Sequence, residues 1–255
     1  MKGLWAITKK EIKTYLTSPI AYVLIAVFLL ISGYFFYNMI WWFNSQSIAM
    51  SRNPYYMRQL NINRFVYEPL FHNISVILLL IFPLLTMRLF AEEKRTGTEE
   101  LLYTSSVTNT EIVLGKFLGA TFVLFVMLLL TGVYAVFGYL YSSPETIPLL
   151  MGYLGLFLMG IAFIGIGLFF SSITESQVVA ASLSFGMLLL LWVLSWSGQA
   201  AGPSLKPILN YLSFFEHFKD MPRGVLNLTD LVYYLSVTYF FLFLTQSYLE
   251  SRRWR

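Results

Sequence analysis

Long, uncharged apolar segments constrain this chain more than any other feature of its sequence. Six stretches are predominantly apolar over about 20 residues, the length that an α-helix needs to cross a hydrocarbon core of roughly 30 Å. They cover residues 20–43, 70–88, 117–141, 147–171, 177–197 and 231–249. A lipid-exposed backbone must satisfy its hydrogen bonds internally, and no alternating barrel pattern is present, so these segments are predicted to be helices. The fold class is therefore all-α integral membrane, with six transmembrane helices.

Composition supports this class and removes several others. Only 12% of the residues are charged and 57% are hydrophobic, whereas about a quarter of an ordinary soluble domain is charged. The chain has no cysteine, which excludes disulfides, thiolate metal sites and thiol nucleophiles. Its net charge of +4 is a sum over two membrane faces and gives no reason to expect nucleic acid as a partner. The partner that the composition predicts is the lipid bilayer.

The positive residues predict the orientation of the spans. An even number of spans places both termini on one side, and the first apolar run is too long for the h-region of a cleavable signal peptide. Eleven of the 17 Lys and Arg residues fall on the side of the termini, which leaves six on the other. The eleven residues on the side of the termini are Lys2, Lys9, Lys10, Lys13, Arg88, Lys94, Arg95, Lys116, Arg252, Arg253 and Arg255. This asymmetry favours cytoplasmic termini.

Residues 1–18 are predicted to form an interfacial helix. On a helical projection one side collects apolar and aromatic residues, and the opposite side collects lysines. The apolar side consists of Leu4, Trp5, Ile12, Tyr15 and Leu16. Such a pattern is typical of a helix that lies in the headgroup plane. The alternative is a charged flank that serves only to set the topology.

The charged segment 89–115, between the second and third spans, has the strongest local signals. It contains two S/T-x-x-E capping boxes, Thr96 to Glu99 and Thr108 to Glu111, in which each hydroxyl caps a helix start and each Glu caps back. We therefore expect two short cytoplasmic helices, the second of which continues into the third span. The alternative is a solvated turn that only connects two spans.

Glycines recur along the fourth span, at Gly152, Gly155, Gly160, Gly165 and Gly167. Small residues allow helices to approach closely in lipid, so a glycine-lined face is expected to pack against another helix. The alternative is that these glycines let the span flex or slide.

Residues 198–229, before the last span, are too apolar for an ordinary soluble loop. They contain three prolines together with an aromatic cluster. We predict a re-entrant hairpin of short helices folded back into the outer leaflet, with protein or a cavity around it. The alternative is an aromatic belt that holds the loop flat on the membrane.

Several catalytic and transport classes are not supported by the sequence. No G-x-x-x-x-G-K-[ST] phosphate-binding loop is present, so the chain is not expected to hydrolyse ATP or to act as an enzyme. The span centres lack Asp and Glu, which argues against an ion-coupled carrier. The paired residues of an intramembrane protease are also missing. His72 and His217 are expected to be interfacial side chains rather than metal ligands.

Several of these segments resemble a known family. The run FAEEKRTGTEELL followed by EIVLGKFLGA is similar to ABC transporter permeases of the type-2 exporter family. The opening KEIKTYLTSPIAYVLIAVF and the run FPLLTMR most resemble the gliding-motility permease subunit GldF and its relatives. The segment LSFFEHFKDMPRGVLNLTDLVYYL resembles the SPF-x-HF pattern of the family, with Leu212, Ser213 and Phe214 standing where many relatives have Ser-Pro-Phe.

The resemblance implies a half-transporter and a set of site residues. Segment 89–115 would dock a separate ATP-binding subunit, mainly through a short coupling helix at about residues 98–105. The docking residues would be Glu92, Glu93, Thr98, Glu99, Glu100, Leu101, Leu102 and Tyr103. The outer hairpin would border the exit of the translocation path, and its gate would comprise Phe214, Phe215, His217 and Phe218.

The resemblance also implies the assembly. The chain itself would carry no cofactor, because ATP and Mg²⁺ would bind to two copies of the ATP-binding subunit. It would dimerise with itself or with a second permease, in a bacterial cytoplasmic membrane, and an accessory subunit with an extracytoplasmic domain could join. The alternative is a membrane scaffold, of the motility or copper-enzyme maturation type, that translocates no substrate of its own.

Overall fold

The computed structural model describes residues 2–50, 61–98, 107–200 and 205–253, and these ranges contain helices and no strands. The α-helices are α1 (Lys2–Thr17), α2 (Pro19–Met50), α4 (Glu68–Thr86), α5 (Arg88–Arg95), α7 (Asn109–Tyr141), α8 (Thr146–Ile173), α9 (Gln177–Ala200), α10 (Lys206–Leu212), α11 (Phe214–Phe218) and α12 (Leu228–Arg253). Two single turns complete the list, the π-helical η1 (Asn63–Tyr67) and the 3-10 turn η2 (Met221–Arg223).

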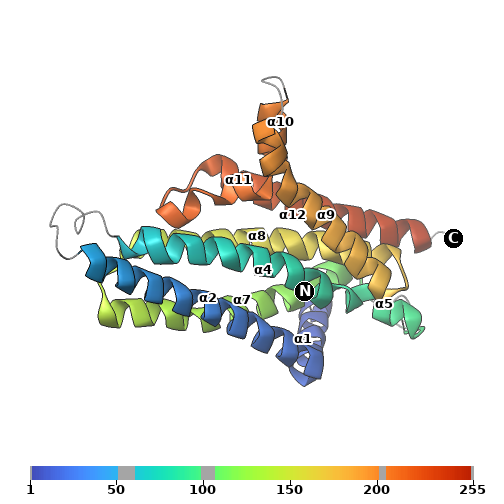
Figure 1. Cartoon of the computed structure of the whole chain (residues 1–255). Helices are drawn as coiled ribbons and strands as arrows, with labels where there is room; N and C mark the ends of the chain where they lie inside the picture. Colours follow the sequence, from blue (N-terminus) through green and yellow to red (C-terminus); the bar gives the residue numbers. More distant parts are fainter. Residues whose placement is uncertain (1, 51–60, 99–106, 201–204, 254–255) are drawn as a thin grey trace.

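Six helical segments in the described part of the chain are long and apolar enough to cross a membrane. They contain α2, α4, α7, α8, α9 and α12. All of these except α9 run roughly parallel or antiparallel, and α9 crosses them obliquely as it rises toward α10 (Figure 1). The predicted all-α integral membrane fold is thereby confirmed. α2 begins at Pro19, a residue whose fixed φ and missing N–H suit the first turn of a helix.

Helix α8 lies at the centre of the bundle, where it contacts α4, α5, α7, α9 and α12. Four of its five glycines make this possible, because a Cβ added to them would fall within 3 Å of a neighbour. The neighbours are Phe71 for Gly152, Met221 for Gly155, Leu124 for Gly160 and Thr86 for Gly167, whereas a Cβ on Gly165 would make ordinary contact with Thr238 of α12 at 3.5 Å. The packing interpretation of these glycines is confirmed. The prediction of one glycine-lined face is wrong, since the glycines meet α4, α7 and η2 on different sides.

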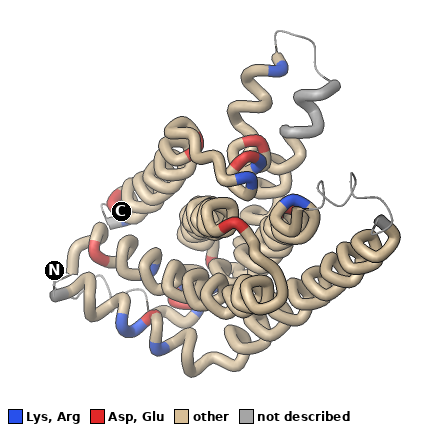
Figure 2. The backbone as a smooth tube through the Cα atoms, turned by 90° about the vertical axis from the view of Figure 1, so that its left-hand side faces the viewer, with Lys and Arg blue, Asp and Glu red and all other residues tan. Residues whose placement is uncertain are grey.

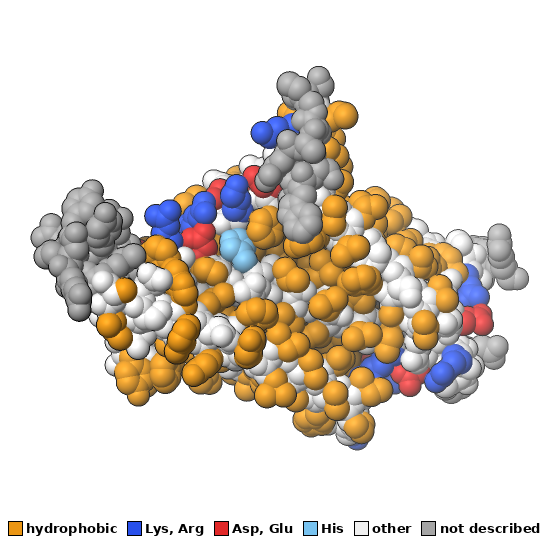
Figure 3. Space-filling model, viewed as in Figure 1, with side chains coloured by type: hydrophobic (Ala, Val, Ile, Leu, Met, Phe, Trp, Pro, Cys, Tyr) orange, Lys and Arg blue, Asp and Glu red, His pale blue; other side chains and the backbone are white. Residues whose placement is uncertain are grey.

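Charged residues are concentrated near the two ends of the bundle. Viewed along the bundle, the long helices are uncharged over most of their length (Figure 2). In space-filling view an apolar belt separates charges near α5 from charges near the outer hairpin (Figure 3). The belt matches what a hydrocarbon core requires of the surface that faces it. Exposed apolar side chains on α2 and α9 are therefore lipid-facing or covered by another subunit.

The second span continues further than the sequence suggested. α4 passes through Pro83 and ends at Thr86, and after Met87 the chain re-enters a helix as α5. Met87 donates its backbone N–H to the carbonyl of Pro83 at 3.0 Å, so the break is one tight turn. Residues 88–95 were predicted to belong to a cytoplasmic loop or its border, but they are helical because Leu89, Phe90 and Ala91 are buried.

Helix α1 also differs from its prediction. It crosses the end of the bundle at a steep angle to the long helices (Figure 1) and packs against α7. Trp5 and Leu16 are exposed, as expected for a helix that touches lipid, but Tyr15 is buried. Its protein-facing side is formed by Ile7, Thr8 and Glu11 together with Tyr15. The projection could not show that a second face of this helix is covered by protein.

Candidate functional site

Helix α5 forms the first part of the predicted docking segment 89–115, and its start is fixed by a serine of α8. Ser171 Oγ accepts hydrogen bonds from the backbone N–H groups of Phe90 at 3.0 Å and Ala91 at 3.2 Å. The same hydroxyl donates to the carbonyl of Met87 at 2.8 Å. The first N–H groups of a helix have no partner within it, so a hydroxyl from another helix satisfies them here. Any displacement of α5 is therefore coupled to the central helix.

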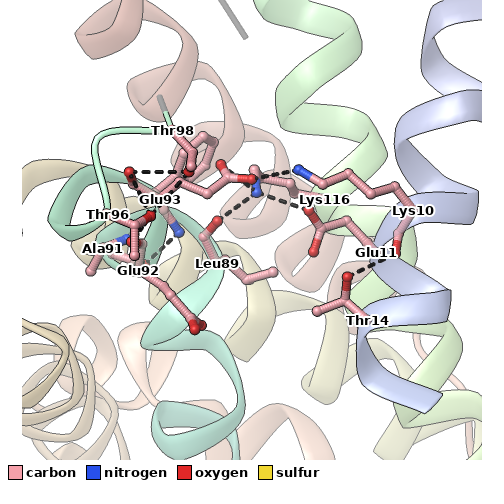
Figure 4. A network of polar contacts seen from close by, with 12 residues as sticks. Lys10, Glu11, Thr14, Leu89, Ala91, Glu92, Glu93, Thr96, Thr98 and Lys116 are labelled. Atoms are coloured by element: carbon pink, nitrogen blue, oxygen red, sulfur yellow. Dashed lines mark hydrogen bonds and ion pairs between the residues drawn. The ribbon is translucent and has the colours of Figure 1, made fainter. Parts of the chain in front are cut away.

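A buried ion cluster holds the other side of α5 (Figure 4). Lys116 of α7 is 1% exposed, and its Nζ lies 2.9 Å from Glu11 Oε1 of α1. The same ammonium lies 2.8 Å from Glu93 Oε2 of α5 and donates to the carbonyl of Leu89 at 2.6 Å. Glu93 Oε1 in turn accepts from Lys10 Nζ at 2.9 Å. The cluster joins α1, α5 and α7 at one point.

Two glycines of α7 allow α1 to come close enough to form this cluster. A Cβ on Gly115 would lie 2.7 Å from Ile7, and a Cβ on Gly119 would lie 2.5 Å from the Cβ of Glu11. Only glycine leaves room for this contact between the two helices. Lys116 lies between these glycines in the sequence, so the close approach brings Glu11 within reach of its ammonium group.

Charge balance explains how these groups can be buried. The two carboxylates of Glu11 and Glu93 are matched by the ammonium groups of Lys116 and Lys10, and Lys116 Nζ also lies 5.1 Å from the ring centroid of Phe90. Burying an unpaired charge costs several kcal/mol, whereas a matched set specifies one geometry with little net gain in stability. Burial lowers the pKa of Lys10, but the hydrogen bond that Lys10 donates to Glu93 and the negative charge of Glu93 outweigh that effect, and the pKa is raised.

The end of α5 is attached to α8 a second time and also to α12. Lys94 donates to the backbone carbonyl of Ser172 at the end of α8. Its Nζ also lies 5.2 Å from the ring centroid of Tyr248 in α12. Together with Ser171 and the ion cluster, these contacts link α5 to α1, α7, α8 and α12. We call this set of contacts the α5 hub.

A cavity of about 510 Å³ opens beside the hub, between α1 and α5. Its lining includes Lys10, Arg88, Glu92, Thr96 and Thr98. Arg88 is held there by a 2.7 Å hydrogen bond to Ser18 Oγ and by the face of Tyr15, 5.1 Å away. The cavity is thus lined by the first part of segment 89–115, directly before the coupling helix that was predicted at about residues 98–105.

The predicted docking residues separate into three groups. Glu92 and Thr98 are exposed and line the cavity. Glu93 was predicted to dock as well, but its side chain is 14% exposed and belongs to the ion cluster, so its pairing within the chain competes with any outside partner. The other five predicted residues, Glu99, Glu100, Leu101, Leu102 and Tyr103, lie outside the residues that the structure describes.

One of the two capping boxes is confirmed and the other is not. Thr108 caps α7, with its side chain accepting from the N–H of Glu111 and Glu111 accepting from the N–H of Thr108. Thr96 instead ends α5: it has helical backbone angles, and its hydroxyl donates to the carbonyl of Glu92 at 2.9 Å. Thr96 therefore marks the C-terminus of α5, and Glu99, the other half of this predicted box, lies outside the residues that the structure describes.

The residues predicted to form an outer gate lie in the predicted hairpin, whose described part contains α10, α11 and η2. Phe214 and Phe218 are buried; Phe214 packs edge-on against Phe163 of α8 at 5.3 Å. Phe215 is partly buried and lies 5.1 Å from the ring of His72 in α4. His217 is buried, and its Nδ1 lies 2.7 Å from Asp230 Oδ1. His217 was predicted to be interfacial, but it is enclosed by α10 and α12.

An ion pair also fixes the hairpin to α4. Arg223 Nε of η2 donates to Glu68 Oε1 at 2.7 Å, and this hydrogen bond, with the charge of Glu68, raises the pKa of Arg223. A nearby cavity of about 380 Å³ is lined by Glu68 and Arg223 together with Asn63 and Glu145. Asn63 bonds the backbone of Glu145 through both its oxygen and its nitrogen. This end of the bundle is closed by contacts between η1, η2 and the start of α8.

Sequence reasoning missed Glu11, Lys116 and Ser171. The spacing Gly115-x-x-x-Gly119 around Lys116 is a recognised signal of close helix packing, and it could have indicated a helix on that face. Ser171 has no comparable signal, because an isolated serine in a long apolar helix is common. Ser171 caps α5 only because the helix breaks at Met87, and the position of this break could not be predicted from the sequence.

The fold and this site define a polytopic helical membrane protein in which α5, directly after the second span, is attached to four other helices. Residues 5–248 match the model of the ABC-2 family transporter protein family, and the chain belongs to this family. A comparison with curated protein sequences finds no match. The chain is thus a multi-pass membrane permease subunit of the ABC transporter class, a class that works with an ATP-binding subunit.

Proposed function

We propose that this chain is the permease subunit of an ATP-driven exporter and docks a separate ATP-binding subunit through residues 89–115. The observation that carries the proposal is the α5 hub. A loop that merely connected two spans would not need its root attached to four helices by a buried ion cluster and a serine cap. A segment that receives force needs such an attachment, since force is lost in a flexible connection.

The hub suggests how movement of the partner reaches the membrane. A push on the docking segment displaces α5, which cannot move without α8 because Ser171 bonds both sides of the Met87 break. The ion cluster passes the same displacement to α1 and α7. Since α8 is the central helix, its movement changes its contacts with α4, α7 and α12 together. The bundle then opens toward the outer hairpin, to move a substrate or to transmit force.

The proposed assembly contains two such permeases and two ATP-binding subunits, with ATP and Mg²⁺ bound by the latter. α2 and α9 are only 22% buried over their apolar windows, against 72% for the second span. This difference supports α2 and α9 as the surfaces that meet a second permease, identical or related. Both termini and segment 89–115 are placed on the cytoplasmic side of a bacterial cytoplasmic membrane, as the distribution of Lys and Arg indicates.

The docking residues can be tested by truncation. Small interfaces are anchored by a few buried apolar side chains, with charges at the rim. Leu102→Ala or Tyr103→Ala should therefore cost about 2 kcal/mol, which lowers affinity for the ATP-binding subunit roughly thirtyfold. Glu92→Gln, as the matched rim variant, should cost about 1 kcal/mol or less. Quantitative pull-down of the ATP-binding subunit in detergent measures both, with expression level and oligomeric state as controls.

Replacement of residues 98–105 by a neutral linker gives the decisive version of this experiment. The proposal expects the linker variant to insert into the membrane and to lose the ATP-binding subunit. The purified variant should therefore show no ATP hydrolysis. Wild-type binding and coupling after the replacement would rule out this segment as the docking site. Retained binding without any ATP-driven movement in the intact protein would instead favour a scaffold.

A further inference from the structure

The buried side chain of His217 faces hydrogen-bond acceptors on both of its ring nitrogens. Nδ1 lies 2.7 Å from the carboxylate oxygen Oδ1 of Asp230. Nε2 lies 2.9 Å from the backbone carbonyl oxygen of Tyr211. A neutral imidazole has one N–H donor and one unprotonated nitrogen, so it could satisfy only one of these contacts. With an ionised Asp230, the other contact would bring two lone pairs together.

The surroundings favour an ionised Asp230, which leaves the extra proton on the histidine. Asp230 lies in the first turn of α12, where the helix dipole stabilises a negative charge. Its second oxygen, Oδ2, accepts a hydrogen bond from the side-chain amide of Asn227 at 3.1 Å. The ring of Tyr233 stacks on His217 with centroids 4.0 Å apart, and an aromatic face attracts a cation.

We propose that His217 and Asp230 form a buried proton-binding site that fastens the outer hairpin to α12. The bound proton makes His217 an imidazolium that donates to Asp230 on one side and to Tyr211 on the other. One side chain of α11 thereby links the end of α10 to the start of α12. His217 acts as a positioning residue, because its neighbours Phe214 and Phe218 are the buried aromatic residues of the hairpin.

The proposed fastening should depend on pH, because it requires a bound proton. Asp230 and Tyr233 face the ring from α12, and Tyr211 faces it from α10 with its carbonyl and its ring edge. Tyr234 of α12 lies edge-on at 6.4 Å. Asp230 is the only carboxylate among these groups and the tyrosines are neutral below their ordinary titration range, so the imidazolium has one counter-charge. Raising the pH removes the bound proton by mass action, and the hairpin loses one of its attachments.

Nitrogen NMR tests the proton directly, and the chain is well suited to it because it has two histidines. The protein, labelled with ¹⁵N-histidine in nanodiscs, should show one ring at neutral pH with both nitrogens protonated. That signal should vanish in His217→Gln, which assigns it. In Asp230→Asn the ring should become neutral, because its counter-charge is lost. A His217 signal with one unprotonated nitrogen at neutral pH would overturn the proposal.

Thiol labelling tests the consequence for the hairpin. Met221, in η2, is fully buried, and the chain has no native cysteine, so Met221→Cys reports opening by its reaction with an added maleimide. Val225→Cys, at a site that is 50% exposed, corrects for the intrinsic effect of pH on thiol reactivity. From about pH 5 to about pH 9, which spans ordinary histidine titration, the ratio of the two rates should rise, by about tenfold for each unit by which closure of the hairpin raises the proton affinity of the pair.

The matched control is His72→Gln, which removes the other histidine and leaves the His217 pair intact. The pH dependence should persist in this variant and disappear in His217→Gln, where labelling should be fast at every pH. A labelling ratio that is independent of pH in the wild-type background would contradict the fastening role. Neither measurement needs an ATP-binding subunit, so their outcome is independent of the proposed docking function.

Discussion

Lys116 is a charged residue whose burial depends on three separate helices. Its ammonium group meets Glu11 of α1, Glu93 of α5 and the carbonyl of Leu89. The ammonium group donates hydrogen bonds to Glu11 and to the carbonyl of Leu89, and its contact with Glu93 is an ion pair at 2.8 Å. These three contacts hold α1, α5 and α7 in one arrangement.

Removing this lysine should be costly. Lys116→Met keeps the approximate length of the side chain but leaves Glu11 buried without a cation, and we expect a loss of about 3–5 kcal/mol. Thermal unfolding in detergent, followed by tryptophan fluorescence, measures it. Lys13→Met, at an exposed lysine of α1, is the matched control and should change little.

A compensating change separates charge from packing in this prediction. Adding Glu11→Gln to Lys116→Met removes the orphaned carboxylate, so the double variant should recover part of the loss. Equal stability of the single and the double variant would show that the cluster contributes through shape alone.

The close packing of helices α1 and α7 depends on the absence of a side chain at the glycines of α7. Gly119→Ala would place a Cβ 2.5 Å from the Cβ of Glu11, whereas Gly132→Ala in the same helix meets nothing within 4 Å. We expect Gly119→Ala to lose about 1–3 kcal/mol through overpacking and Gly132→Ala to be neutral or slightly stabilising. Comparing the two melting temperatures checks this, and equal values would contradict the close approach.

The attachment of α5 to α8 depends on the hydroxyl group of Ser171. Ser171→Ala leaves the N–H groups of Phe90 and Ala91 without their acceptor, which costs about 1–3 kcal/mol for a buried donor. Ser172→Ala is the adjacent control, because its hydroxyl donates within its own helix, to Phe169. Hydrogen exchange of a peptide that covers residues 88–95 should become faster in the first variant and stay unchanged in the second.

The elements differ in how far sequence could predict them. The six spans were predictable because length and apolar content together decide whether a segment crosses a membrane. α5 was missed because its charged run, Glu92, Glu93, Lys94 and Arg95, is typical of a loop. The buried residues that make it a helix all precede this run. The ion cluster could not be derived, since Glu11 and Lys116 are 105 positions apart and only the tertiary packing of α1 brings them together.

At the scale of the whole molecule, the two ends of the bundle are built differently. The end with α5 is joined by charges in a buried cluster and borders a cavity of about 510 Å³. The other end is closed by aromatic packing, by the Arg223–Glu68 pair and by the His217–Asp230 pair. The central helix α8 contacts elements of both ends. This arrangement suits a protein in which an event at one end changes the closure of the other.

The most direct test of the account is a crosslink from the beginning of the docking segment. Thr98 is exposed, and Thr98→Cys would be the only thiol in a chain without cysteine. A bifunctional thiol reagent should join it to a protein that contains the G-x-x-x-x-G-K-[ST] loop, identified by mass spectrometry. Labelling should occur from the cytoplasmic side, while Val225→Cys at the opposite end should react from outside and form no such crosslink. Labelling of position 98 only from outside, or the absence of a crosslink from the cytoplasmic side in the assembled complex, would contradict the account.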